Sequence, residues 1–267
     1  MKKKTEFSKQ HLQYIAKEKR NSALVHTAQI GVLVVFLVLW EALAQLGVID
    51  SFITSSPTRV FATLGELGAS GLKHALVSTY ETVLGFVIGT AAGYIVAVAL
   101  WWNKYLQKVF QPYLVVLNSL PKIALGPLVI LWAGTGKASI ITMAVLISVV
   151  ITTITVLTGF NETDPDKITL LLSMGANRRQ IFLLLVAPSN VPTLAATLKI
   201  NVGMSWVGTI MGEYLVSKEG LGYLLIYGSQ TFRLDLVMTC TIVLCALAGA
   251  MYALVALLEK FIDKKRA

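Results

Sequence analysis

Six stretches of the chain are apolar over the roughly 20 residues that a helix needs to cross about 30 Å of hydrocarbon. They comprise residues 28–46, 76–102, 109–133, 138–160, 193–216 and 236–262. A backbone in lipid must pair its own N–H and C=O groups, and a helix does so within one segment. The pattern therefore predicts an all-α, polytopic membrane protein with about six transmembrane helices.

Composition supports this prediction. Hydrophobic residues make up 55% of the 267 residues and charged residues only 14%, with a mean hydropathy of +0.71. A water-facing surface needs more charge than this. The net charge of +9 would suggest nucleic acid only if the basic residues formed a stripe on a soluble fold. They lie instead between the apolar stretches, so we expect the lipid bilayer, and no nucleic acid, as a partner.

The distribution of Lys and Arg predicts the orientation, because positive charge near a span stays on the cytoplasmic side. Sixteen of the 23 basic residues lie in the two terminal tails, the second-to-third connection and the connection 161–190, and five lie in the opposite connections. We therefore expect a protein of the cell (inner) membrane with both termini in the cytoplasm. The chain divides into a basic cytoplasmic tail, residues 1–27, and a transmembrane domain, residues 28–267.

Two further patterns concern the first half of the chain. Residues 55–57 (SSP) are typical of a helix start and precede apolar residues at helical spacing, which predicts a short amphipathic helix within 51–74 that lies at the membrane interface or is simply exposed. Gly85, Gly89 and Gly93 follow at steps of four residues. Small residues on one helix face mark close helix–helix contact in lipid, so we expect another helix to pack there.

The third apolar stretch contains polar residues where lipid disfavours them. Three prolines interrupt it, with Asn118 and Lys122 near the middle break. A proline frees a backbone carbonyl, which is tolerated in the membrane only when it faces protein or a water-filled path. Asn118 and Lys122 are therefore candidates for lining a pore, although Lys122 could instead extend to an interface. Trp206 and Glu213 are further pore-lining candidates in the fifth stretch.

The residues needed for chemistry are not grouped. The chain has two cysteines, Cys240 and Cys245, and three scattered histidines, so we expect no disulfide, metal or cofactor. Residues 134–139 (GTGKAS) only superficially match a phosphate-binding loop, because Leu131 and Ala138 occupy the positions of an essential glycine and hydroxyl. No catalytic constellation is evident, so an enzyme is the weaker hypothesis.

The connection 161–190, called the coupling segment below, is longer than a chain reversal requires. Asp164-Pro165 is typical of a helix start, residues 168–174 are apolar, and Gly175 permits a helix stop before two arginines. These features predict a short helix across the inner membrane face whose apolar side contacts either lipid or a partner protein.

The coupling segment resembles the signature of permeases of binding-protein-dependent ABC importers, in particular the nitrate/sulfonate/taurine-type group. In that family Glu-Ala-Ala is followed by Gly and, nine residues later, by Ile-x-Leu-Pro. Here Thr169-Leu170-Leu171, Gly175 and residues 185–188 (LVAP) occupy those places, and the glycine and Pro188 match. Residues 120–136 (LPKIALGPLVILWAGTG), 206–213 (WVGTIMGE) and 220–223 (GLGY) strengthen the resemblance, which covers about residues 49–262.

The resemblance implies a type I ABC importer permease that performs no chemistry itself. Its implied partners are a second permease chain, most simply a second copy, two ATP-binding subunits that hydrolyse ATP, and an extracytoplasmic substrate-binding protein. The implied substrate is a small solute, in particular an anion such as an aliphatic sulfonate, taurine or nitrate. A permease for a thiamine-pyrimidine precursor or another small nutrient, and an ATP-independent carrier, are the alternatives.

The resemblance also implies which residues couple the chain to the ATP-binding subunits. These are Asp164, Asp166, Thr169, Leu170, Leu171, Gly175, Ala176 and Pro188. Two departures concern contacts with the partner: Thr169 stands where the family has an acid, for which Asp164 or Asp166 could compensate, and Leu170 and Leu171 are larger than alanine.

Overall fold

The structure, a computed structural model, describes residues 9–266, and these residues form helices and turns without a strand. The all-α prediction is therefore confirmed for the described chain. The helical elements are α1 (Lys9–Gln45), α2 (Ser51–Thr54), α3 (Pro57–Trp102), α4 (Lys104–Ser119), η1 (Lys122–Leu125), α5 (Gly126–Ala133), α6 (Lys137–Asn161), α7 (Pro165–Ser173), α8 (Arg178–Ile181), η2 (Phe182–Val186), α9 (Ala187–Ser189), α10 (Val191–Val216), α11 (Leu221–Gln230) and α12 (Leu234–Arg266). Residues 1–8 of the predicted basic tail lie outside the described chain, and the tail from Lys9 onward is continuous with the first predicted span in α1.

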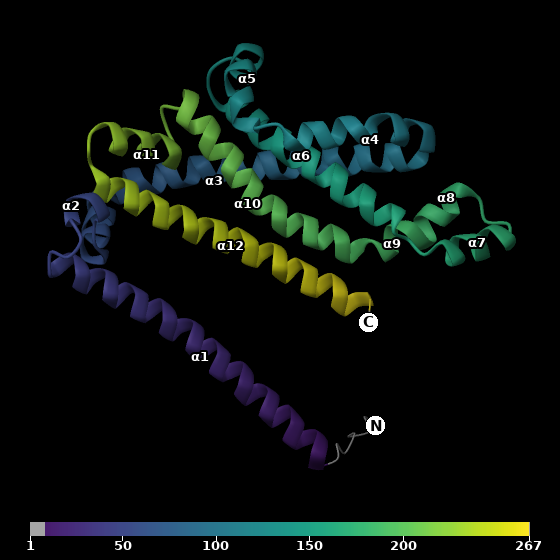
Figure 1. The fold of residues 1–267 in the computed structure, drawn as a ribbon, viewed down its shortest axis with the longest axis horizontal. Helices are drawn as coiled ribbons and strands as arrows, with labels where there is room; N and C mark the ends of the chain where they lie inside the picture. Colours follow the sequence, from purple (N-terminus) through teal and green to yellow (C-terminus); the bar gives the residue numbers. More distant parts are fainter. Residues whose placement is uncertain (1–8, 267) are drawn as a thin grey trace.

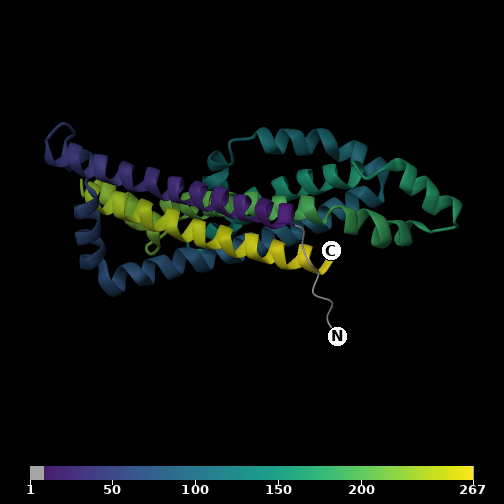
Figure 2. The same ribbon diagram turned by 90° about the horizontal axis from the view of Figure 1, so that it is seen from below.

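The elongated molecule has two distinct ends. Helices α2 and α11 lie at one end, and α7 and α8 lie at the other (Figure 1). The same separation is visible in the perpendicular view (Figure 2). Helices α1 and α12 both start or end near α2, and in Figure 1 α1 runs obliquely away from the other helices. Below, the two ends are called the α11 end and the α7 end.

Helices α3, α6 and α10 form the packed centre. Gly85, Gly89 and Gly93 of α3 lie against Ala144, Ser148 and Thr152 of α6, and an added Cβ atom at any of the three glycines would come within 2.6 Å of a side-chain carbon of α6. Because no side chain separates them, the two helix backbones approach closely over two turns.

A buried polar row joins α10 to the same centre. Side chains at steps of four residues lie on one face of α10 and are 0–1% exposed: Thr197, Asn201, Ser205, Thr209 and Glu213. The Asn201 amide donates to the hydroxyls of Thr90 in α3 and Thr152 in α6, and the hydroxyls of Ser148 and Ser205 lie 2.9 Å apart. Such bonds satisfy polar groups that would be costly to leave unpaired in an apolar interior, and they set the register of the three helices.

Four described helices are long and apolar enough to cross a membrane, and the count rises to six if each of two bent pairs forms one span. The third predicted span is not one continuous helix. It is divided into α4 and η1–α5, which are bent by 93°, because the chain leaves helical geometry at Leu120–Pro121. The fifth span, α10, is preceded by a 57° bend after the short helices α8, η2 and α9.

The predicted amphipathic helix within 51–74 begins where expected. The Ser56 hydroxyl accepts a hydrogen bond from the Arg59 N–H, and Pro57 occupies the first turn of α3. The helix continues into the second span, and the two parts meet at a kink at Gly68, whose φ of 47° suits glycine. Glu41 of α1 accepts hydrogen bonds from the N–H and hydroxyl of Thr58, which attaches the end of α1 to this part of α3.

Candidate functional site

The coupling segment begins with a well-capped helix. The Asp164 carboxylate accepts a hydrogen bond from the N–H of Asp166, and Pro165 occupies the first turn of α7. A carboxylate is favourable at this position because the N–H groups of the first turn are unpaired and the helix dipole is positive there. The helix ends before Gly175, whose φ of 83° lies in the left-handed region. The Asp164-Pro165 start and Gly175 stop therefore lie where the sequence predicts them.

A second short helix returns the chain toward the membrane. Asn177 and Gln180 form a capping box at the start of α8, in which each side chain bonds the backbone of the other. The Arg178 guanidinium donates to the carbonyl of Trp101 and lies over the Trp101 ring. This contact joins the coupling segment to the end of α3.

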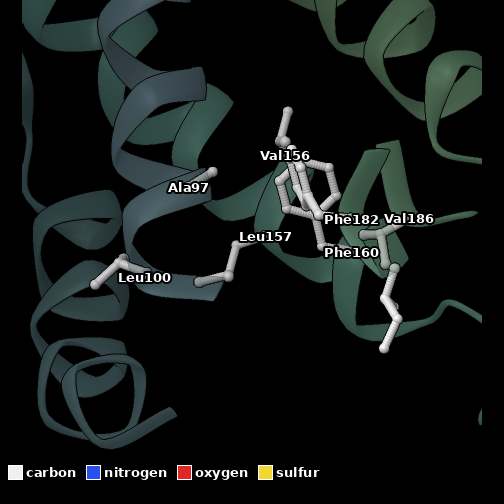
Figure 3. Packing of buried hydrophobic residues seen from close by; sticks show 8 residues of the cluster. Ala97, Leu100, Val156, Leu157, Phe160, Phe182 and Val186 are labelled. Atoms are coloured by element: carbon white, nitrogen blue, oxygen red, sulfur yellow. The ribbon is translucent and has the colours of Figure 1, made fainter. Parts of the chain in front are cut away.

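An aromatic and aliphatic cluster anchors the segment (Figure 3). Phe160 at the end of α6 and Phe182 in η2 pack edge to face, with ring centroids 5.5 Å apart, and Val186 is fully buried beside them. Ile168 and Leu171 of α7, with Ala176, pack against this cluster from the coupling segment. One side of α7 is therefore attached to the ends of α3 and α6.

Three apolar side chains of α7 and of the residue that follows it are without cover. Leu170, Leu172 and Met174 are 59%, 56% and 74% exposed. Thr169 is also exposed, and its hydroxyl donates to the carbonyl of Pro165 within the same helix. The two leucines that stand where the family has alanine thus differ in place: Leu170 is exposed, whereas Leu171 is half-buried against the cluster.

The remaining coupling candidates surround this surface. Asp166 is exposed and Asp164 is half-buried, with Lys167 lying 3.6 Å from the Asp164 carboxylate. Pro188 is half-buried. Asn190, two residues later, is buried, and its side-chain amide donates to the Thr163 hydroxyl and the Val186 carbonyl. Asn190 thereby holds the two ends of the coupling segment together.

The pore-lining candidates fall into two groups. Asn118 is exposed and Lys122 is half-buried at the break between α4 and η1, and the Lys122 ammonium donates to the Asn118 carbonyl over 3.2 Å. No side chain of α4 is buried within the chain. The break in the helix therefore places an exposed Asn118 and a half-buried Lys122 side by side.

Trp206 and Glu213 belong to the second group, and in this structure both lie inside the bundle. Trp206 is 5% exposed and packs with Val202 and Val255, and Glu213 is 1% exposed. Both lie on the face of α10 that packs inside the bundle of a single chain, so neither presents a surface to a passing solute in this conformation. The sequence does not show this placement, because a helix of nearly uniform hydropathy does not reveal which face is internal.

Sequence reasoning also missed Glu81 and the pairing of charged groups within the spans. Glu81 of α3 is 1% exposed, and its carboxyl group lies in direct contact with that of Glu213. Lys199 of α10 forms an ion pair with Glu259 of α12. The two acids lie 132 and 60 residues from their partners in the chain, so only the packing of the helices brings each pair together.

Comparison with known proteins identifies the family that shares this architecture. Residues 89–267 match the family described as "Binding-protein-dependent transport system inner membrane component". A "Probable ABC transporter permease protein" of Haemophilus influenzae is 31% identical over 229 residues, which cover 85% of this chain and 94% of the relative. The formylaminopyrimidine transport permease protein ThiX of Halalkalibacterium halodurans is 29% identical, over 70% of this chain and 75% of the relative.

Two further similarities point the same way. The putative aliphatic sulfonates transport permease protein SsuC of Bacillus subtilis is 24% identical, over 87% of this chain and 85% of the relative. The fold is similar to a chain of the MetNI methionine ABC transporter solved in an inward-facing conformation, with a TM-score of 0.63 and 18% identity over 72% of this chain and 95% of that chain. The resemblance of the motifs is thus confirmed, and the chain belongs to the inner-membrane components of binding-protein-dependent transport systems, the permeases of ABC importers.

Proposed function

We propose that this permease, paired with a second copy, forms the pore through which a small anion such as an aliphatic sulfonate, taurine or nitrate enters the cytoplasm. Two separate ATP-binding subunits bind the α7 end, and an extracytoplasmic binding protein delivers the solute to the α11 end. Both termini lie in the cytoplasm, in keeping with the basic residues of the tails.

The observation that carries this proposal is the partial burial of α7. Ile168 and Leu171 attach it to the Phe160–Phe182 cluster, while Leu170, Leu172 and Met174 remain exposed beyond the ends of the spans. Three uncovered apolar side chains on and directly after a short, well-capped helix fit a docking surface for another protein better than an open aqueous face. A helix in contact with lipid alone would have no need of the tight attachment to α3 and α6.

Movement of α7 reaches the bundle through a short path. From Gly175 the chain passes through α8, η2 and α9 into α10, which is bent by 57° from the preceding segment. ATP-driven closure of the partner subunits would displace α7 and with it the inner end of α10. Such coupling requires that α7 contact its partner differently in two states.

The nature of the solute rests on Lys122 and on the relatives. Lys122 and Asn118 present an ammonium and an amide at the broken helix, groups that suit an anion passing along the path. The SsuC relative supports a sulfonate. The ThiX relative favours a second candidate, a formylaminopyrimidine, which Asn118 could recognise by hydrogen bonding.

The docking surface is tested by co-purification. We expect Leu172→Asp, which changes an exposed residue, to abolish co-purification of the ATP-binding subunits expressed together with the permease, and with it ATP-dependent uptake. Phe232→Asp, which changes an apolar residue at the α11 end that is even more exposed, is the control and should leave the complex intact. Normal uptake by Leu172→Asp would contradict the assignment, and so would uptake by the permease without ATP-binding subunits.

The solute is tested with four probes: methanesulfonate, taurine, nitrate and a formylaminopyrimidine. We expect the reconstituted transporter, with its binding protein, to import one of the three anions and Lys122→Met to lower that uptake. Import of the pyrimidine alone would establish the second candidate instead. An unchanged uptake by Lys122→Met would exclude Lys122 from the path.

A further inference from the structure

The start of α11 is held by side chains of two other helices. A helix leaves its first N–H groups without partners inside the helix. At α11 the Gly220 N–H donates to His74 Nδ1 over 2.9 Å, and the Leu221 N–H donates to the Ser78 hydroxyl over 2.8 Å. The Gly222 N–H donates to Glu213 Oε2. Residues of α3 and α10 therefore replace the cap that α11 lacks on its own.

Glu213 is the centre of this arrangement, called the α11 latch below (His74, Ser78, Glu213, Gly220 and Gly222). Its Oε1 accepts a hydrogen bond from the Ser78 hydroxyl of α3, while its Oε2 accepts from α11. The side chain itself belongs to α10. One buried carboxyl group thus joins three helices, and an acidic group is favourable at the positive end of the α11 dipole.

The two glycines of the latch leave room for this carboxyl group. A Cβ atom at Gly220 would lie 2.4 Å from the Glu213 carboxyl carbon, and one at Gly222 would lie 2.7 Å from the Glu213 Cβ. Gly220 also has a φ of 105°, which disfavours any other residue. Two blocks that are separate in the sequence, 206–213 (WVGTIMGE) and 220–223 (GLGY), are therefore parts of one structural device.

The position of the latch on α10 gives it a mechanical role. Helix α10 spans 26 residues, about 39 Å at 1.5 Å per residue, and begins directly after the coupling segment. Its inner start therefore follows α7–α9, and its far end carries Glu213. When one end of a rigid helix is displaced, its other end moves as well. The latch determines whether α11 moves together with α10.

We infer that Glu213 is a positioning residue that fastens α11 to α10 and α3, so that ATP-driven movement of the coupling segment is passed along α10 to the α11 end of the pore. The inference rests on the proposed function, because it takes α7 as the site where the ATP-binding subunits act. In this role Glu213 acts from a buried position and does not touch the solute.

Glu213→Gln is the decisive variant. Glutamine has the same length but offers one acceptor oxygen, whereas the latch has two donors, Ser78 and Gly222, bonded to separate oxygens. Loss of one such bond, at about 1.4 kcal/mol, corresponds to a factor of about ten. We therefore expect solute imported per ATP hydrolysed to fall about tenfold, measured with whichever of the four probe solutes the wild type imports.

The position of α11 is measured in the same complex. Spin labels on Ile200→Cys in α10 and Tyr227→Cys in α11, both at exposed positions, report the distance between the two helices. We expect one narrow distance distribution in the wild type, both without nucleotide and when trapped with ATP and vanadate. In Glu213→Gln the distribution should broaden and differ between the two states.

Two further variants separate this role from a general effect on folding. Ser78→Ala, which removes one donor to Glu213 and the acceptor for Leu221, should give the same uncoupling if Glu213→Gln fails to fold. Glu66→Gln changes an exposed acid at the same end of the molecule and should behave as the wild type. A loss of folding alone would lower ATP hydrolysis and uptake together, whereas loss of the latch lowers uptake per ATP.

The outcomes distinguish this inference from the proposed function. Unchanged coupling and an unchanged α10–α11 distance in both Glu213→Gln and Ser78→Ala would overturn the role of Glu213, while the docking assignment would stand. Failure of the wild-type chain to bind ATP-binding subunits would overturn the proposed function, and this inference would fall with it.

Discussion

The contact between α3 and α6 depends on the absence of side chains at three positions, and Gly85 allows this to be tested most directly. A Cβ atom at Gly85 would lie 2.4 Å from the Cβ of Ala144. Because carbon atoms prefer separations of about 3.5–4.0 Å, Gly85→Ala must push the helices apart by roughly 1 Å or distort one of them. The other atoms near that Cβ, in Ile141 and Ala144, lie at ordinary contact distances of 3.5 and 3.6 Å.

The geometry gives an approximate magnitude. An extra methyl group in a tightly packed core costs about 1–3 kcal/mol. The replacement of glycine by alanine within a helix recovers up to about 1 kcal/mol. We therefore expect Gly85→Ala to destabilise the permease by about 1–2 kcal/mol.

The companion change Ala144→Gly removes the atom that would clash. Alone it should destabilise the protein, because it deletes a buried methyl group, worth about 0.8 kcal/mol, and introduces a helical glycine. In the double variant the new methyl group of residue 85 fills the space vacated at residue 144. The coupling free energy of the two changes should therefore favour the double variant by about 1–3 kcal/mol.

Thermal unfolding in a fixed detergent checks this cycle. For a protein of about this size, 1 kcal/mol corresponds to roughly 2–4 °C in Tm, so the single variants and the recovery should be measurable. Gly203→Ala is the matched control, because Gly203 lies within α10 with no neighbouring atom within 4 Å of an added Cβ. The reasoning is refuted if Gly85→Ala is as stable as Gly203→Ala, or if the double variant shows no recovery.

Three other predictions concern single contacts. Gly175→Ala should weaken ATP-dependent uptake and destabilise the end of α7 by about 1–2 kcal/mol, because φ is 83° there; uptake assays and proteolysis of the coupling segment check this. The single variant Lys199→Met should be less stable than the double variant that also carries Glu259→Leu, since the single change leaves the half-buried Glu259 without this ion pair. A comparison of the Tm values of the two variants checks this. The hydrogen bond and charge of Lys73 lower the pKa of Glu219 in the folded protein. The stability that this pair contributes is therefore present above the ordinary pKa of Glu219 and is lost as the pH falls through the lowered pKa. Lys73→Met should reduce that dependence of stability on pH.

Elements that depend on local signals were predictable from the sequence. The coupling helix follows from Asp164-Pro165 at its start and Gly175 at its end, because capping and a left-handed φ are properties of a few adjacent residues. The spans follow from length and hydropathy in the same way. The break at Leu120–Pro121 was visible as a proline, but its 93° bend was not, because the angle depends on how α5 packs against α6 and α10.

Elements that depend on which helix face is internal were not predictable. Glu213 and Trp206 read as polar or amphipathic residues in an apolar run, which suits a pore, yet both face the bundle interior. Glu81 drew no attention, and α11 was not recognised as a helix of its own. Its first N–H groups are capped by residues of α3 and α10, far away in the sequence, so no local signal marks its start.

The sequence by itself determined the membrane class, the approximate spans, the coupling helix and the family, because hydropathy, capping and motif spacing depend on residues that are close together along the chain. Only the tertiary structure decided that the glycines of α3 meet α6, that Leu170 is exposed while Leu171 is anchored, and that Glu213 holds α11. These facts depend on contacts between segments many residues apart. Such contacts arise when helices choose their faces and register, and a pattern of apolar residues on nearly uniform helices does not specify that choice.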